Sequence, residues 1–167
     1  MPIKKDLKEI NCSLAQALAA IGDWWSLLVM RDIFLGNQRF SEIQRSLGIA
    51  TNMLTRRLDD LAKVDVIVRS TVDGRPFYRL SERGMAVVPA LIGILQWGDA
   101  EFAPEGPPVV FVDSQGRKLS RVRLEAEDGT PVDPAELRPT VGPGANQKTR
   151  AAFAAKAAAR AAAQVKP

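Results

Sequence analysis

The chain has 167 residues, 46% of them hydrophobic and 25% charged, which is typical of a globular protein with one core and short appendages. No apolar run reaches the roughly 20 residues of a membrane-spanning helix, and residues 1–10 lack the apolar stretch of a signal peptide, so we expect a cytoplasmic protein without membrane contact. The single cysteine excludes an internal disulfide framework. Because the chain has no histidine, the commonest metal ligand and general base, we expect no metal site, cofactor or enzymatic activity.

The net charge of +4 is distributed unevenly. Residues 146–167 carry five basic residues and no acidic residue, and the rest of the chain has 18 basic and 19 acidic residues, a net charge of −1. A second local excess lies between Arg39 and Arg83, where eight arginines and Lys63 face six acidic residues. Nucleic-acid contacts are therefore expected in these two segments.

The N-terminal half contains a succession of helical patterns. Residues 14–21 (LAQALAAI) place apolar residues at i, i+4 and i+7, which predicts an amphipathic helix. Residues 24–35 (WWSLLVMRDIFL) are apolar on most faces and predict a central helix that ends at Gly36. Ser41 is expected to cap a short helix, which Gly48 closes in the left-handed conformation.

The next predicted helix has two different faces. Thr51 is expected to cap it, and its buried stripe consists of Leu54, Leu58 and Leu61, at i, i+4 and i+7. At 100° per residue, Asn52 and Arg56 point away from this stripe, with Thr55 beside them. The helix is therefore expected to present a polar face to a partner.

A β-hairpin is predicted next, over residues 66–80 (VIVRSTVDGRPFYRL). Its β-branched residues flank Asp73-Gly74, a dipeptide that favours the positive φ angles of a tight turn, and Arg75 lies at its tip. Ser81 then caps a long helix with more apolar residues than one small domain can bury, so this helix is expected to need a partner. Pro89 should kink this helix or begin a new one.

The C-terminal third has a different composition. Beyond the helix-breaking residues 104–108 (PEGPP), two alternating segments with glycine-containing turns predict a small β appendage that extends to residue 145. Residues 146–167 are alanine-rich and helix-prone but have little apolar bulk to bury, so they form a solvated helix or are disordered. The predicted organisation is thus a main domain of helices and a hairpin over residues 1–103, the appendage over 104–145, and a basic tail over 146–167.

Two short helices joined by a glycine turn, the second with a polar face, followed by a hairpin, predict a winged helix-turn-helix, a mainly α fold with a small β-hairpin. An α-helix fits the major groove, where asparagine can pair with adenine and arginine with guanine, and an arginine-bearing hairpin can reach the adjacent minor groove. The alternative is a winged-helix protein-interaction or scaffold module that does not bind DNA sequence-specifically.

The stretch GDWWSLLVMRDIFLGNQRFSEIQRSLGIATNMLTRRLDDL, followed by YRLSERG and LQWG, resembles the HxlR-type regulators of bacteria and archaea, a MarR-like winged-helix family. The resemblance covers roughly residues 10–103. It implies a sequence-specific transcriptional regulator of double-stranded DNA, with a repressor favoured over an activator. It also implies a homodimer formed by the first and last helices, which binds a pseudo-palindromic operator through successive major grooves.

The resemblance assigns DNA contacts to three regions. Arg39 lies at the entrance of the motif and Ser41 on the supporting helix, and Arg57 is expected at a phosphate. The polar face of the second helix reads the bases through four residues, here called the reading face: Thr51, Asn52, Thr55 and Arg56. On the hairpin, here called the wing, charge raises affinity without specifying sequence; its arginines are Arg69, Arg75 and Arg79.

Two further features leave alternatives open. Cys12 corresponds to the thiol that is oxidised or alkylated in redox-sensing family members, and a buried structural cysteine is the alternative. A set of aromatic residues could line a pocket for a small aromatic effector or could simply pack in the core: Trp24, Trp25, Phe34, Trp97 and Phe102. The appendage resembles a ribbon-like module of some family members but lacks its cysteine pairs, so no zinc is expected.

Overall fold

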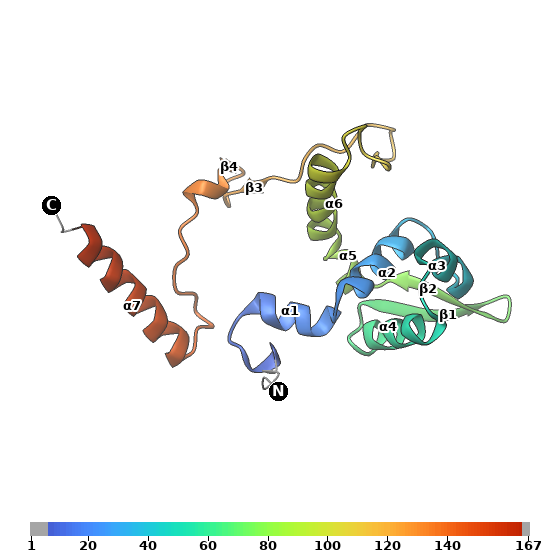
Figure 1. The fold of residues 1–167 in the computed structure, drawn as a ribbon, viewed down its shortest axis with the longest axis horizontal. Helices are drawn as coiled ribbons and strands as arrows, with labels where there is room; N and C mark the ends of the chain where they lie inside the picture. Colours follow the sequence, from blue (N-terminus) through green and yellow to red (C-terminus); the bar gives the residue numbers. More distant parts are fainter. Residues whose placement is uncertain (1–6, 165–167) are drawn as a thin grey trace. The chain divides into compact units, whose positions relative to one another are not determined.

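The computed structural model describes residues 7–164 (Figure 1). They form two compact units: Leu18–Val122, here called the central unit, and the described residues of Met1–Ala17 and Arg123–Pro167, here called the terminal unit. The chain is mainly helical with small β-hairpins, which confirms the predicted fold class, and the winged helix-turn-helix lies in the central unit.

The central unit consists of helices around one antiparallel hairpin. The first helix, α1 (Ser13–Ile21), begins in the terminal unit and ends in the central unit. The other elements are α2 (Trp24–Phe34), α3 (Phe40–Leu47), α4 (Thr51–Lys63), β1 (Ile67–Val72), β2 (Arg75–Leu80), α5 (Glu82–Met85) and α6 (Val88–Phe102).

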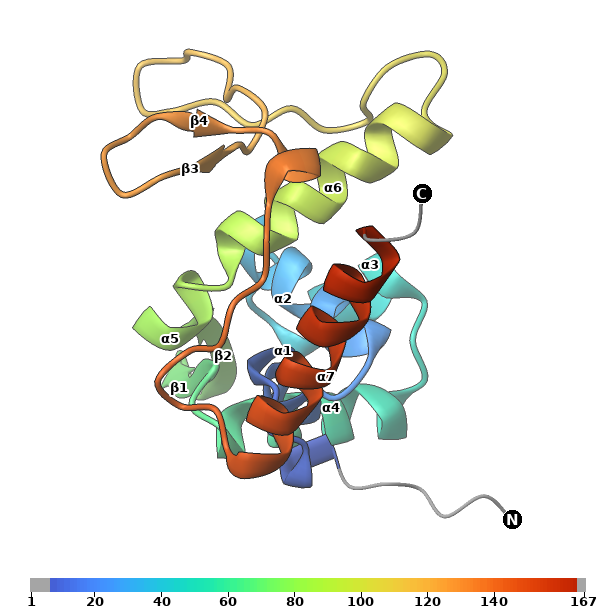
Figure 2. The same cartoon turned by 90° about the vertical axis from the view of Figure 1, so that its left-hand side faces the viewer.

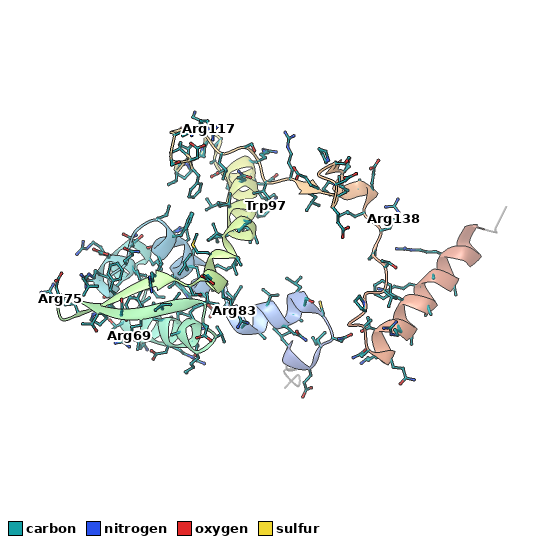
Figure 3. All side chains as sticks on the ribbon, turned by 180° about the vertical axis from the view of Figure 1, so that it is seen from behind. Arg69, Arg75, Arg83, Trp97, Arg117 and Arg138 are labelled. Atoms are coloured by element: carbon teal, nitrogen blue, oxygen red, sulfur yellow. The ribbon has the colours of Figure 1, made fainter. Side chains whose placement is uncertain are left out.

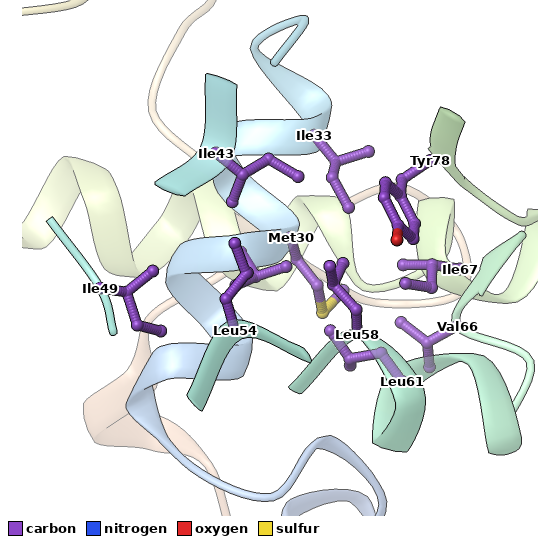
Figure 4. Close-up of a cluster of buried hydrophobic side chains, with 11 residues drawn as sticks. Met30, Ile33, Ile43, Ile49, Leu54, Leu58, Leu61, Val66, Ile67 and Tyr78 are labelled. Atoms are coloured by element: carbon purple, nitrogen blue, oxygen red, sulfur yellow. The ribbon is translucent and has the colours of Figure 1, made fainter. Parts of the chain in front are cut away.

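One cluster of buried apolar side chains joins α2, α3, α4 and the hairpin (Figure 4). Helix α2 contributes Met30 and Ile33, and α3 contributes Ile43. Helix α4 contributes the predicted leucine stripe, Leu54, Leu58 and Leu61, whose burial is confirmed. A fully buried side chain of this size contributes about 1.5–3 kcal/mol, so the leucine face fixes the orientation of α4 and leaves its other face outward.

The turns of the helix-turn-helix are as expected, but the caps predicted at Ser41 and Thr51 are wrong. Gly48 ends α3 with φ 61°, the left-handed conformation. Helix α3 begins at Phe40, one residue before Ser41, because the Glu42 carboxylate accepts hydrogen bonds from the backbone N–H groups that precede the helix. Thr51 is the first residue of α4, and its hydroxyl accepts a bond from Gln44 Nε2 at 2.8 Å instead of capping the helix.

The predicted hairpin is confirmed. Its turn residues Asp73 and Gly74 both have positive φ angles, 53° and 70°, and Val72 pairs with Arg75 across the turn. At the other end of β2, the Tyr78 backbone N–H donates to the Gln38 carbonyl at 2.8 Å, so the base of the wing is attached to the segment that leads into α3.

The last predicted helix is divided in two. Ser81 caps α5, since its Oγ accepts from the Gly84 N–H at 3.0 Å, and a new helix, α6, begins at Val88. Pro89 lies in the first turn of α6, where the missing N–H is not needed. Gly84 packs so closely that an added Cβ would lie 2.1 Å from the Val66 carbonyl oxygen. Close packing of α5 against the base of the wing therefore requires glycine here.

The predicted β appendage contains little regular structure. Within the central unit, an isolated bridge pairs Val112 with Lys118, and the Gln96 side chain of α6 donates to Ser120 O at 2.9 Å and accepts from Val122 N at 2.8 Å. Hydrogen bonds from the Arg117 backbone and side chain lower the pKa of Asp113 in the turn of this bridge.

The terminal unit contains the second hairpin and the tail. Figure 2 shows the short antiparallel pair β3 (Leu124–Glu125) and β4 (Pro131–Val132), followed by the 3-10 turn η2 (Pro134–Glu136) and the continuous helix α7 (Gln147–Gln164). Another 3-10 turn, η1 (Leu7–Glu9), precedes Asn11, whose Oδ1 accepts from Asn146 N at 2.9 Å and Thr149 Oγ1 at 2.8 Å. The tail is thus helical where described, and Asn11 holds its first turn.

None of the described helices is by itself long and apolar enough to cross a membrane, although α1 and α2 reach that length and composition when taken as a bent pair.

Candidate nucleic-acid interface

The reading face of α4 is exposed along its whole length. Its residues, Thr51, Asn52, Thr55 and Arg56, are all exposed and lie opposite the buried leucines of the same helix. The Arg56 side chain is 73% exposed and extends beyond the helix. The helix therefore presents hydroxyl, amide and guanidinium groups together, which are the groups that can pair with base edges in a major groove.

Thr51 Oγ1 accepts from Gln44 Nε2 of α3, and the other three side chains make only local interactions. Thr55 Oγ1 donates to the Thr51 carbonyl at 2.9 Å, and Asn52 Oδ1 accepts from the Met53 N–H at 2.8 Å. Arg56 Nε lies 3.9 Å from Asp60 Oδ2. Exposed i,i+4 ion pairs contribute only about 0.3–0.5 kcal/mol, so Arg56 can leave Asp60 for a nucleic-acid partner at little cost.

The wing exposes its three arginines on two faces. Figure 3 shows Arg75 at the end of the hairpin and Arg69 along it. Arg69 pairs with Tyr78 in the strand register and its guanidinium lies 5.9 Å from the Tyr78 ring centroid, whereas Arg75 and Arg79 lie on the opposite face of β2. The structure therefore groups Arg75 with Arg79 and separates both from Arg69.

A groove of about 580 Å³ lies between the N-terminus of α3 and the tip of the wing. It brings three predicted DNA-contact residues together, Arg39, Ser41 and Arg75. Ser41 is exposed at its rim, while the Arg39 side chain points to the wing, where it donates to two backbone carbonyls.

The prediction that Arg57 contacts a phosphate is wrong. Arg57 is only 7% exposed, and its guanidinium lies 3.2 Å from Asp23 and 3.5 Å from Asp60. The reason is its position one turn from Leu54 and Leu61, which places it on the buried side of α4, beneath the N-terminus of α2. Arg57 therefore ties α4 to Asp23, the residue that caps α2.

Asp60, which the sequence pattern did not single out, lies at the centre of this charge network. Its carboxylate lies within 4 Å of three cationic side chains, those of Arg56, Arg57 and Lys63. The i,i+3 and i,i+4 spacing between Asp60 and the flanking basic residues was the available signal. Asp60 thus connects the exposed reading face to the buried Arg57.

Cys12 is exposed, so the alternative of a buried structural cysteine is wrong. It lies immediately before α1, in the terminal unit, and lines a pocket of about 420 Å³. Among the other residues that line this pocket are Gln16, Thr149 and Phe153.

The five aromatic residues of the predicted effector pocket do not gather around one cavity in the described chain. Trp97 and Phe102 form an edge-to-face pair on α6, 5.6 Å between centroids, but are 59% and 75% exposed. Trp25 packs against the core, and Trp24 is exposed. The ring centroids of Phe34 and Phe111 lie 5.9 Å apart. The five predicted side chains project from different faces of α2 and α6, so the described chain gives no support to a single pocket lined by all five.

Comparisons with known proteins agree with this geometry. The family model described as HxlR-like helix-turn-helix matches residues 20–106. An HTH-type transcriptional regulator of Mycobacterium tuberculosis is 33% identical over 141 residues, which cover 81% of this chain and 89% of the relative. Another, from Methanothermobacter thermautotrophicus, is 38% identical over 94 residues, covering 54% of this chain and 72% of the relative.

Solved structures extend the similarity beyond α6. The crystal structure of PA1607, described as a transcription factor, gives a TM-score of 0.72 at 38% identity and covers 81% of this chain and 98% of that one. PA1374 from Pseudomonas aeruginosa gives 0.59 at 33% identity, with coverage of 84% and 99%. Because 81% and 84% of the chain are covered, the similarity includes part of the chain beyond residue 106, where the match to the family model ends. The chain therefore belongs to the HxlR-like helix-turn-helix family of DNA-binding transcriptional regulators, which are not enzymes.

Proposed function

We propose that this protein is a sequence-specific transcriptional regulator that binds a pseudo-palindromic operator as a cytoplasmic homodimer. The observation that carries the proposal is the two-sided character of α4: its leucines are buried, and its reading face is exposed beside an arginine-bearing wing. In this arrangement α4 enters the major groove, its reading face pairs with base edges, and the wing arginines contact the neighbouring backbone.

Exposed apolar residues support the proposed dimer. Helix α6 exposes Ile94, Trp97 and Phe102, and Figure 3 shows Trp97 projecting from it. Helix α1 exposes Leu14 and Leu18. Exposed apolar side chains of this size favour burial between protomers. A two-fold dimer would place its two α4 helices on half-sites about one helical turn of DNA apart.

Repression is the simplest effect of such a dimer, because a dimer bound at the operator excludes other proteins from that DNA. We assign the DNA-binding and dimerisation role to residues 1–103. The basic helix α7 is proposed to add backbone contacts that do not read sequence, since its described basic side chains, Lys148, Arg150, Lys156 and Arg160, are exposed and no acidic residue lies among them.

A redox or electrophile signal would act through Cys12, whose thiol is exposed and lines a pocket. The test is to treat the wild type and Cys12→Ser with N-ethylmaleimide and to measure operator binding. Loss of binding in the treated wild type alone supports sensing, and equal binding in both removes Cys12 as the sensor. The described aromatic arrangement gives no support to a small aromatic effector.

The proposal is tested with duplexes from the DNA upstream of the gene, by fluorescence anisotropy at several salt concentrations. Arg56→Ala should weaken operator binding by about 1–3 kcal/mol and relax the base preference at one position. Arg121→Ala, which removes an equal charge from an exposed site outside the interface, is the matched control. Unchanged affinity and preference in Arg56→Ala would refute the reading face. Absence of salt-sensitive binding in the wild type would favour the scaffold alternative.

A further inference from the structure

Arg39 has an environment unlike that of the other predicted DNA-contact arginines. Its Nη1 atom donates to the Val72 carbonyl at 2.9 Å and to the Arg75 carbonyl at 3.2 Å, which engages both of its N–H groups. Its Nη2 atom lies 3.9 Å from the Asp73 carboxylate, and its guanidinium lies 5.2 Å from the Phe77 ring centroid. The side chain is only 26% exposed, so most of its surface is used within the protein.

The acceptors of these bonds are at the part of the wing that has least other support. Val72 and Arg75 flank the Asp73-Gly74 turn, and residues 69–76 are all exposed. Tyr78, by contrast, is buried in the core, so the base of the wing is fixed by packing. A two-stranded hairpin without packing is marginally stable in water. The tip of the wing therefore depends on contacts such as those of Arg39.

The main chain of Arg39 is itself fixed. The Glu42 carboxylate accepts from the Arg39 N–H at 2.8 Å and from the Gln38 N–H at 2.9 Å, in the first turn of α3. The planar guanidinium can bond two carbonyls and stack on a ring at the same time, which the single ammonium of lysine cannot reproduce. Arg39 is thus a rigid link between α3 and the wing tip.

We propose that Arg39 is a positioning residue, which fixes the direction of the wing tip and so holds Arg75 toward DNA, and that it does not itself contact a phosphate. The expected effect of Arg39 on DNA affinity rests on the proposed DNA binding. Its effect on the order of the wing tip does not, and it can be measured in the free protein. This positioning role replaces the interpretation of Arg39 as a direct contact, because Nη1 bonds two carbonyls of the wing, Nη2 lies beside the Asp73 carboxylate, and the side chain is only 26% exposed.

The first experiment measures the wing in the free protein. Backbone ¹⁵N order parameters of Asp73, Gly74 and Arg75 should be near the rigid value of about 0.85 in the wild type and fall below about 0.6 in Arg39→Ala. Those of α4 should not change, which would show that the variant is folded. Arg45→Ala, which removes an exposed arginine from the same helix, is the matched control and should leave the tip ordered. Unchanged order at the tip in Arg39→Ala would overturn the proposal.

The second experiment measures binding to the operator duplex in a double-mutant cycle. Arg75→Ala should weaken binding roughly threefold to tenfold, and adding Arg39→Ala should then cost less than about twofold, because both act through one contact. Arg39→Lys keeps the charge but should lose as much affinity as Arg39→Ala. Multiplicative losses, or full binding by Arg39→Lys, would instead identify Arg39 as a direct phosphate contact. Failure of the wild type to bind any duplex would overturn the proposed function and leave the order-parameter result to decide the role of Arg39.

Discussion

Helices α4 and α7 both carry basic side chains, but different forces hold them. Helix α4 buries three leucines and Arg57 in the central unit, so packing determines which of its faces is outward. Helix α7 consists largely of alanine, has no fully buried residue among its described side chains, and is held at its first turn by Asn11. Packing therefore fixes the orientation of α4 and determines which residues form its reading face. Helix α7 is helical because of its residue propensities, so it contributes charge but no defined reading face.

The largest expected effect comes from removing the packing of α4. Leu58→Ala should destabilise the central unit by about 2–5 kcal/mol, because it leaves a cavity in the core. Phe153→Ala, the matched change in α7, should leave the unfolding of the central unit unchanged, because Phe153 lies in the terminal unit. Urea unfolding followed by tryptophan fluorescence measures both. Equal destabilisation by the two variants would abolish the distinction between the helices.

Substitution of Arg57 tests whether its ion pairs with Asp23 and Asp60 also stabilise the position of α4. Arg57→Met should cost about 1–3 kcal/mol, less than the loss of a partner from a fully buried pair, because Asp23 and Asp60 remain partly exposed to water. Arg150→Met in α7 should change the stability by no more than about 0.5 kcal/mol. Urea unfolding of the two variants gives the comparison. A neutral Arg57→Met would mean that the leucines alone position the helix.

The basic charge of α7 is expected to affect only the affinity for DNA and its salt dependence. Deletion of residues 146–167 should lower nonspecific affinity and reduce the slope of log K against log salt by several units, since each phosphate contact contributes about 0.9. Operator preference and dimerisation should not change, because they are assigned to residues 1–103. Anisotropy titrations and light scattering measure these quantities. An unchanged salt slope would make α7 an inert extension.

The smallest expected effect is a pH dependence of the β3–β4 turn in the terminal unit. A hydrogen bond from the Thr130 backbone lowers the pKa of Asp128, so this turn is stabilised above the ordinary pKa of about 3.8 and loses that stabilisation as the pH falls through the lowered value. The protection factors of the Gly129 and Thr130 amides against hydrogen exchange should therefore fall in acid before those of the α4 amides do. Asp128→Asn should remove the dependence. Acid-sensitive exchange that persisted in Asp128→Asn would place its origin elsewhere.

Sequence alone determined the elements whose signals are local. The leucine spacing of α4, the Asp73-Gly74 turn and the left-handed Gly48 each depend on neighbouring residues, so the helix-turn-helix, the wing and the exposed reading face followed from periodicity and turn chemistry. The family could be identified for the same reason, because its pattern combines these local signals.

Only the tertiary structure decided what each arginine does. Arg56 and Arg57 are adjacent in the sequence, yet one is exposed and the other is buried between Asp23 and Asp60, and Arg39 contacts carbonyls more than 30 residues away. The direction of a long charged side chain depends on acceptors that folding brings near it from distant segments. The caps expected at Ser41 and Thr51 failed for a more local reason, because Glu42 bonds the backbone that precedes α3 and Gln44 bonds the Thr51 hydroxyl. The separation of the five aromatic residues again depends on packing between distant segments, such as that of Phe34 with Phe111.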